Sequence, residues 1–129
     1  MQVCVRRDVW ETMWKDARGR APEEAVGLLL GHNGCAIEAK PLPNVGIPPH
    51  ARYKADPLLL LAVLRLADAQ GMDVCAVYHS HPAGLPLPSF TDKEEATWNV
   101  PYVILGLASA QARAFLLPEG KEVKINVEP

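Results

Sequence analysis

The sequence lacks the features that mark secreted proteins. Among its 129 residues are only three cysteines, Cys4, Cys35 and Cys75, and no CxxC pair occurs. An odd number of cysteines at wide spacing argues against a disulfide scaffold and favours a reducing compartment, so we expect small core residues at all three positions. The first ten residues, MQVCVRRDVW, also lack the apolar segment of a secretory signal.

Long apolar runs and an excess of charge of one sign are absent as well. The longest apolar run, 57–64, is far shorter than the roughly 20 residues that a membrane span requires. Thirteen Lys and Arg stand against 15 Asp and Glu, which leaves a formal net charge of −2 and excludes the basic footprint of a nucleic-acid binder. We therefore expect a cytoplasmic protein that contacts neither membrane nor nucleic acid.

The apolar content is sufficient for one folded domain. Hydrophobic residues make up 49% and charged residues 22%, a balance that excludes a disordered chain. The length suits a single domain over 1–129, without repeats or linkers, and is too short for a barrel of the TIM type, which takes about 250 residues.

Hydrophobic periodicity predicts a mixture of strands and helices, and hence the α/β (α+β) class. Strands are expected at 2–6, 24–31, 35–40, 73–78, 101–108, 111–117 and 122–127, and helices at 7–18, at 57–70 and from about residue 92. Asn33-Gly34 predicts a hairpin between the second and third strands.

Two apolar features belong to the expected helices. Asp56 should cap the 57–70 helix, which carries leucine on nearly every side, so we expect Leu58–Leu66 to be core and not a partner face. Trp10 and Trp14 should pack the first helix against the sheet, and if they were exposed they would indicate a homodimer surface.

The segment His79-Ser80-His81-Pro82 carries metal-binding chemistry at the end of an apolar strand. Residues i and i+2 of a strand face the same side, with Cα atoms roughly 6.5–7 Å apart, so both imidazoles can converge on one ion while Ser80 points away. Asp92 follows His81 after ten intervening residues and completes a His2Asp set, which leaves the fourth tetrahedral position of a catalytic zinc for water.

Hydrolysis at such a site also needs a carboxylate that accepts a proton and passes it to the leaving amine. Glu24 begins the 24–31 strand, which we expect to lie beside the 73–78 strand and so to bring Glu24 to the histidines. The side chain of its neighbour Glu23 should point the opposite way and face solvent. The candidates are Glu23, Glu24, Glu38 and Glu94.

These residues together resemble the signature of the JAMM (MPN-plus) zinc metalloproteases, in their minimal prokaryotic form. Glu24 precedes AVGLLLG, the segment HSHPAGLPLPSFTD ends at Asp92, and the likeness extends to Pro43-Asn44 and Tyr53…Asp56. The resemblance implies a mixed, curved β-sheet flanked by helices, similar to the cytidine deaminases. It also implies one zinc ion per chain.

The resemblance further implies a role for each signature residue. His79, His81 and Asp92 would be zinc ligands, Glu24 the general base, and Ser89 the donor to the oxyanion. The substrate would be the C-terminal Gly-Gly tail of a ubiquitin-like or sulfur-carrier protein, cleaved at a peptide or isopeptide bond. The chain has no room for the insertions with which eukaryotic members hold ubiquitin.

Other interpretations remain open for the same residues. Ser89 and Asp92 fit a helix capping box, with Thr91 and Glu94 as a rival pair that would free Asp92 for a metal. His32 and His50 lie in expected loops and should be surface residues.

Three other functions compete with the protease. A metal-free MPN-type interaction module would share the fold without catalysis. A zinc deaminase would need H-x-E and P-C-x-x-C, which are absent, and an amidohydrolase would need a longer barrel.

Overall fold

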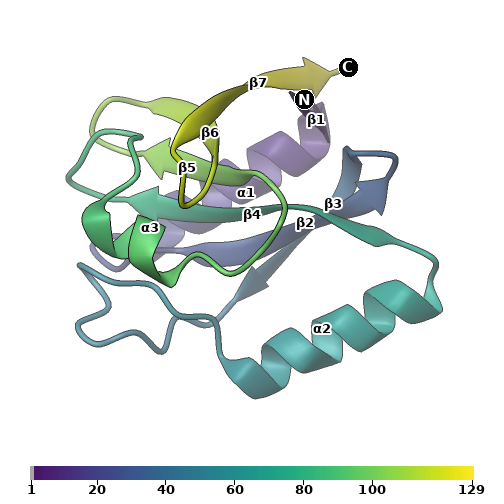
Figure 1. Ribbon diagram of the computed structural model, residues 1–129, viewed down its shortest axis with the longest axis horizontal. Coiled ribbons are helices and arrows are strands. Elements are labelled where there is room, and N and C mark those ends of the chain that lie inside the picture. The colour runs from purple at the N-terminus through teal and green to yellow at the C-terminus, as the bar shows by residue number, and fades with distance from the viewer. Residues whose placement is uncertain (1) are drawn as a thin grey trace.

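The computed structural model describes residues 2–129, which form a closed, mixed β-sheet with helices packed around it (Figure 1). The elements in chain order are β1 (Gln2–Arg6), α1 (Arg7–Arg20), β2 (Val26–His32), β3 (Cys35–Leu42), α2 (Pro57–Ala69), β4 (Asp73–His81), α3 (Phe90–Glu95), β5 (Tyr102–Gly106), β6 (Gln111–Leu116) and β7 (Lys121–Glu128). The predicted α+β class and all the predicted elements are confirmed, with shifts of a few residues at their ends.

The strand order is β1-β3-β2-β4-β5-β6-β7, and the sheet closes because β1 pairs with both β3 and β7. β2 runs antiparallel to β3 and β4, while β4 runs parallel to β5. The turn between β2 and β3 is the predicted hairpin, in which Asn33 and Gly34 both adopt positive φ angles of 52° and 76°. β4 therefore lies centrally, and it ends beside α3 at the left of Figure 1.

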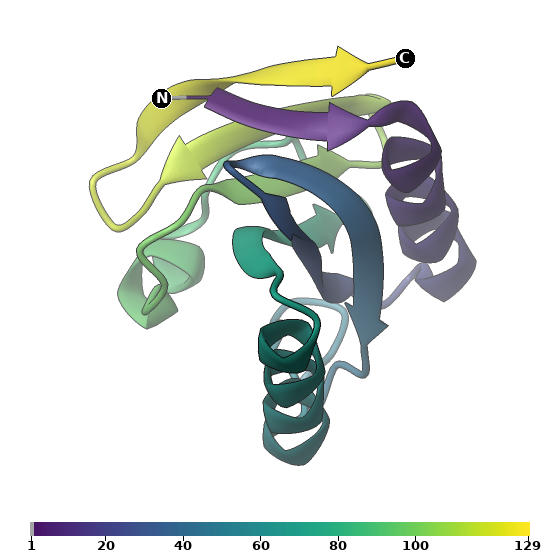
Figure 2. The same ribbon diagram turned by 90° about the vertical axis from the view of Figure 1, so that its right-hand side faces the viewer.

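Strand alternation divides the hydrophobic residues between two clusters. Leu29 of β2 belongs to the cluster covered by α1, whereas Leu28 and Leu30 belong to the cluster on the other face, toward α2. Trp14 is buried in the first cluster and Trp10 packs against it, as predicted for α1. Figure 2 shows α1 and α2 on different sides of the sheet.

The prediction that Leu58–Leu66 is core holds only for Leu60, Val63 and Leu64, which pack partly buried against the second cluster, and is wrong for the other leucines. Ala67 is the one fully buried residue of α2, whereas Leu58 is 79% exposed and Leu59, Leu61 and Leu66 are 45–47% exposed. The helix does begin at its predicted cap, where Asp56 Oδ1 accepts hydrogen bonds from the amides of Leu58 and Leu59.

The physical reason is that α2 packs on the sheet along one side only (Figure 2). Beneath that side lies a largely apolar cavity of about 410 Å³, whose lining includes Leu28, Leu60, Val77 and Tyr102. An apolar helix needs neighbours on every side to be buried, and the helix's own sequence does not specify how many neighbours it has.

The prediction of unbridged cysteines in the core is wrong for Cys35, which is exposed and bridged, and partly wrong for Cys4, which is buried as expected but bridged. Cys4 of β1 and Cys35 of β3 form a disulfide, because the two strands pair in parallel with these residues in register and their Cα atoms 4.4 Å apart. Cys75 is free and buried, as expected. Spacing in the sequence does not report distance in the fold, so the cysteines do not support the inference of a reducing compartment.

None of the helices found in residues 2–129 has the length and apolarity that crossing a membrane requires.

Candidate metal centre and active site

β4 presents the two histidines on one face of the sheet. The Nε2 atoms of His79 and His81 lie 3.2 Å apart, His79 is fully buried, and the side chain of His81 is 13% exposed. Ser80 points to the opposite face, where its Oγ accepts a hydrogen bond of 2.8 Å from the amide of Ala25 on the neighbouring chain segment. The prediction that both imidazoles converge while Ser80 turns away is confirmed.

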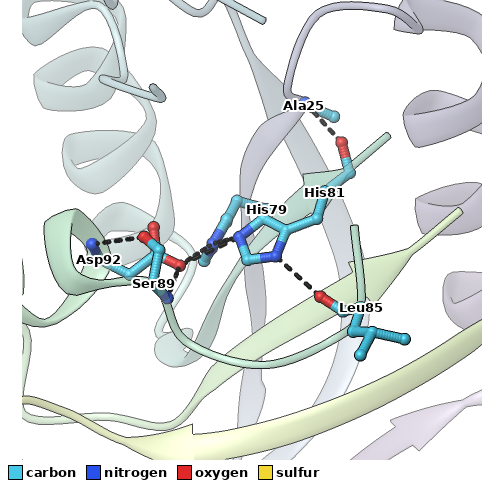
Figure 3. A network of polar contacts seen from close by, with 7 residues as sticks. Ala25, His79, His81, Leu85, Ser89 and Asp92 are labelled. Atoms are coloured by element: carbon cyan, nitrogen blue, oxygen red, sulfur yellow. Dashed lines mark hydrogen bonds and ion pairs between the residues drawn. The ribbon is translucent and has the colours of Figure 1, made fainter. Parts of the chain in front are cut away.

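α3 brings Asp92 against both histidines. Its Oδ2 atom lies 3.1 Å from His79 Nε2 and 3.0 Å from His81 Nε2 (Figure 3). The same atom accepts a hydrogen bond of 2.9 Å from the amide of Ser89, while Ser89 Oγ accepts one of 3.0 Å from the amide of Asp92. The capping box therefore exists and holds Asp92 at the cluster, and the rival prediction of Thr91 as the cap is wrong.

Glu24 is the acidic residue that joins this cluster. It lies two residues before β2 and is 7% exposed, and its Oε1 atom has no hydrogen-bond partner among residues 2–129. One ligand atom from each of Glu24, His79, His81 and Asp92 lies within 4.8 Å of the others. Glu23 is exposed, as expected from alternation.

The remaining candidate residues from the sequence lie elsewhere. Glu38 and Glu94 are not members of the cluster, and Glu94 is exposed. His32 and His50 are exposed surface residues, as predicted.

The geometry of the three predicted ligand atoms fits a zinc ion. The Nε2 atoms of His79 and His81 and the Oδ2 atom of Asp92 form a triangle with sides of 3.0–3.2 Å. In a zinc tetrahedron with metal–ligand bonds of roughly 2.0–2.1 Å, two ligand atoms lie about 3.3 Å apart. His81 Nδ1 lies 2.9 Å from the carbonyl oxygen of Leu85, which can accept a hydrogen bond from a protonated Nδ1 and so favours the tautomer whose Nε2 lone pair is free for a metal.

The protonation states of Asp92 and His79 also suit a metal. Burial alone would raise the pKa of Asp92, but hydrogen bonds with His79 and His81 outweigh it and hold the pKa of this carboxyl well below its ordinary range. Burial lowers the pKa of His79, which favours the neutral imidazole that binds metals. A carboxylate and neutral imidazoles are the donors of catalytic zinc sites.

Burial raises the pKa of Glu24 from 4.5 to about 7. A carboxyl with a pKa near the working pH can both accept and release a proton, which is the property of a general acid–base group. The raised pKa of Glu24 thus distinguishes it from Asp92, the other carboxyl of the cluster, whose pKa is lowered.

Tyr53 is a site residue to which the sequence analysis assigned no role. Its ring stacks on His79 with centroids 4.1 Å apart and an interplanar angle of 20°. It lies in the proline-rich segment 43–56, where no periodicity exists to reveal which side chain faces inward. The family likeness at Tyr53 was the one signal that could have identified it.

The comparisons with known proteins agree with this geometry. The model of a family described as prokaryotic homologs of the JAB domain matches residues 6–117. A probable TtuB-protein conjugate cleaving protease from Thermus thermophilus is 50% identical over 107 residues, or 83% of this chain and 70% of that protein. A desampylase from Pyrococcus furiosus is 30% identical over 109 residues, or 81% of this chain and 76% of the relative.

Solved structures show the same fold. A protein from Desulfitobacterium hafniense superposes with a TM-score of 0.87 at 29% identity, with 99% of this chain and 93% of the other covered. A JAB1/MPN domain protein from Archaeoglobus fulgidus gives a TM-score of 0.71 at 22% identity, with 98% and 100% covered, a likeness that concerns the fold alone. On the extent of the family match and of these relatives, the chain belongs to the prokaryotic JAB-domain family, within the JAMM/MPN proteins.

Proposed function

We propose that the protein is a zinc-dependent peptidase or isopeptidase that hydrolyses the amide bond after the C-terminal Gly-Gly of a ubiquitin-like or sulfur-carrier protein. The observation that carries this proposal is the convergence of Glu24 with His79, His81 and Asp92 within 4.8 Å. The relatives support the same class of reaction, since one is named as a conjugate-cleaving protease and another as a desampylase.

Three residues would hold the metal and leave one position for substrate and water. His79, His81 and Asp92 would be the ligands, with the capping box and the Leu85 carbonyl keeping two of them oriented. A bound zinc lowers the pKa of a coordinated water to about 7 and polarises the scissile carbonyl.

Glu24 would move the proton. As the water oxygen attacks the carbonyl carbon, the carboxylate of Glu24 accepts the water's proton and then delivers it to the amine nitrogen as the carbon–nitrogen bond breaks. The unpartnered Oε1 atom is available for this transfer because no hydrogen bond within the described chain occupies it.

Ser89 would stabilise the negative charge that develops on the carbonyl oxygen. The residue is exposed beside the cluster, and its Oγ accepts a hydrogen bond from the amide of Asp92, which leaves its own proton free to be donated. One such donor contributes a factor of about 10²–10³ to kcat in hydrolases.

The test is cleavage of a defined tail. A ubiquitin-like sulfur carrier with a short extension after its Gly-Gly is incubated with the zinc-loaded protein, and the products are weighed by mass spectrometry. We expect cleavage after Gly-Gly that stops when both glycines are alanine, when a chelator removes the zinc, or in the Glu24→Gln variant. Equal cleavage of tails without glycine, or cleavage of linked polyubiquitin alone, would contradict the substrate assignment.

A measurement of metal content distinguishes the proposed enzyme from the alternative, a metal-free interaction module. A module without catalysis would bind no zinc in the cluster and would leave the extended carrier intact. One zinc ion per chain, measured by elemental analysis of purified protein, is the outcome that we expect.

A further inference from the structure

The side chain of Asn44 lies at the centre of the 43–56 segment and connects it to the main chain of Glu24. Its Nδ2 donates to the carbonyl oxygen of Glu24 at 3.0 Å, to that of Pro49 at 3.2 Å and to that of Arg52 at 3.0 Å. A side-chain amide has two N–H groups, so all of its donor capacity is used on three carbonyls. The nitrogen of Asn44 thus holds together two parts of the loop and Glu24, which lies two residues before β2.

The oxygen of the same amide is also fully engaged. Asn44 Oδ1 accepts hydrogen bonds from the amide of Gly46 at 2.8 Å and from that of Lys54 at 2.9 Å. The loop also has an isolated bridge between Asn44 and Ala55, and so it is folded around this one side chain.

Besides Asn44, hydrogen bonds of Glu24 and of its neighbours hold the main chain around Glu24. The amide of Glu23 donates to the carbonyl oxygen of Arg20 at 2.9 Å, and the amide of Ser80 donates to that of Ala25 at 3.1 Å. The amide of Glu24 donates to the carbonyl oxygen of Pro49 at 2.8 Å, and Pro49 is itself held by Asn44. On the other side, the amide of Ala25 donates to Ser80 Oγ. Because Glu24 Oε1 makes no hydrogen bond, the carboxylate depends on the main chain and on packing for its place at the cluster.

We propose that Asn44 is a positioning residue for Glu24, which rests on the proposed function in which Glu24 is the general base. Asn44 fixes the main chain from which the base projects, and its side-chain hydrogen bonds go to main-chain atoms alone. The predicted ligands come from β4 and α3, so metal binding should not depend on it. A loosened base lowers kcat, because a misplacement of about 1 Å can cost on the order of 100-fold in rate.

Asn44→Asp tests the proposal with a side chain of the same shape. The carboxylate still accepts from Gly46 and Lys54, but it cannot donate, and it repels the carbonyl oxygen of Glu24. We expect kcat on the extended carrier to fall on the order of 10–100-fold, with KM and zinc content within about twofold of the wild type.

Amide hydrogen exchange gives a readout that does not need activity. In Asn44→Asp the amide of Glu24 should exchange faster as Pro49 moves away, while the amides of Gly46 and Lys54 stay protected. The amide of Ala25, which is bonded to Ser80, should be unchanged.

Two more variants keep the test decisive. Asn126→Asp makes the same isosteric change at a half-buried position on β7, outside the cluster, where Nδ2 donates to Glu128, and should leave kcat unchanged. Gly46→Ala displaces the centre of the loop without removing Asn44, since a Cβ would lie 2.9 Å from Asn44 Oδ1 and 2.7 Å from the carbonyl oxygen of Arg52. Gly46→Ala should show the same loss of kcat. If Asn44→Asp does not fold, this variant still tests whether the loop positions Glu24.

The outcomes are distinguishable. Wild-type kcat in Asn44→Asp, or a loss of kcat with unchanged exchange at the Glu24 amide, would overturn the positioning proposal and leave the proposed function standing. Loss of zinc together with kcat would also overturn it, because Asn44 would then serve the metal. A fully active Glu24→Gln variant would overturn the proposed function itself.

Discussion

Ser89 caps α3 and is the proposed oxyanion donor, and a pair of substitutions should separate these two roles. In the structure its Oγ caps α3 by accepting the amide of Asp92 at 3.0 Å, and its hydroxyl lies exposed beside the cluster. Ser89→Ala removes both the cap and the hydroxyl. Ser89→Gly removes the hydroxyl but leaves a residue that is nearly as good at the N-cap position.

The two variants should differ in their stability but not in their kcat. Replacing a serine cap by alanine lowers the free energy of unfolding by about 1 kcal/mol, whereas replacing it by glycine lowers it by only about a few tenths of 1 kcal/mol. In a chain of this size, 1 kcal/mol corresponds to a Tm shift of about 3–5 °C. Both variants lack the oxyanion donor, so both should lose on the order of 10²–10³ in kcat.

The assay combines calorimetry with steady-state cleavage of the extended carrier. Zinc content should remain at one ion per chain in both variants, because Ser89 is not in the predicted ligand set, and Ser89→Thr, with its hydroxyl and cap, should retain most activity. Wild-type kcat in Ser89→Gly would refute the reasoning and leave Ser89 as a helix cap. Activity that follows stability, with the alanine variant much the weaker enzyme, would show that the placement of Asp92 matters and the hydroxyl does not.

The remaining predictions concern the base and the metal. Glu24→Gln should keep zinc and lose hydrolysis while Glu23→Gln, at an exposed position, stays close to wild type; equal losses in the kinetic assay would mean that the base is misassigned. His81→Ala should lose both zinc and activity, and elemental analysis that still finds one zinc per chain would contradict the ligand set. In the metal-free protein, burial raises the pKa of Glu24 from 4.5 to about 7, so the native state binds this proton more tightly than the unfolded state. That contribution to stability is present below about pH 4.5 and is lost as the pH rises through 7. The urea midpoint of Glu24→Gln should therefore exceed that of the wild type by more at pH 8 than at pH 4.5, and an equal difference at both would rule this out.

The sequence by itself determined the features that depend on neighbouring residues. Strand alternation put His79 and His81 on one face and Ser80 on the other. Asn33-Gly34 specified the hairpin through the positive φ angles that such turns need. These features follow from steric preferences and hydrogen bonds within a few residues, which is why a single sequence reveals them.

The tertiary structure decided everything that depends on which distant segments meet. Cys4 meets Cys35 because β1 and β3 pair in register, and α2 stays half exposed because the sheet offers it only one side. The stacking of Tyr53 on His79 likewise comes from a loop without periodicity. Contacts of this kind depend on the register of the whole sheet and on the number of neighbours that each element finds, and neither quantity is encoded in a local stretch of residues.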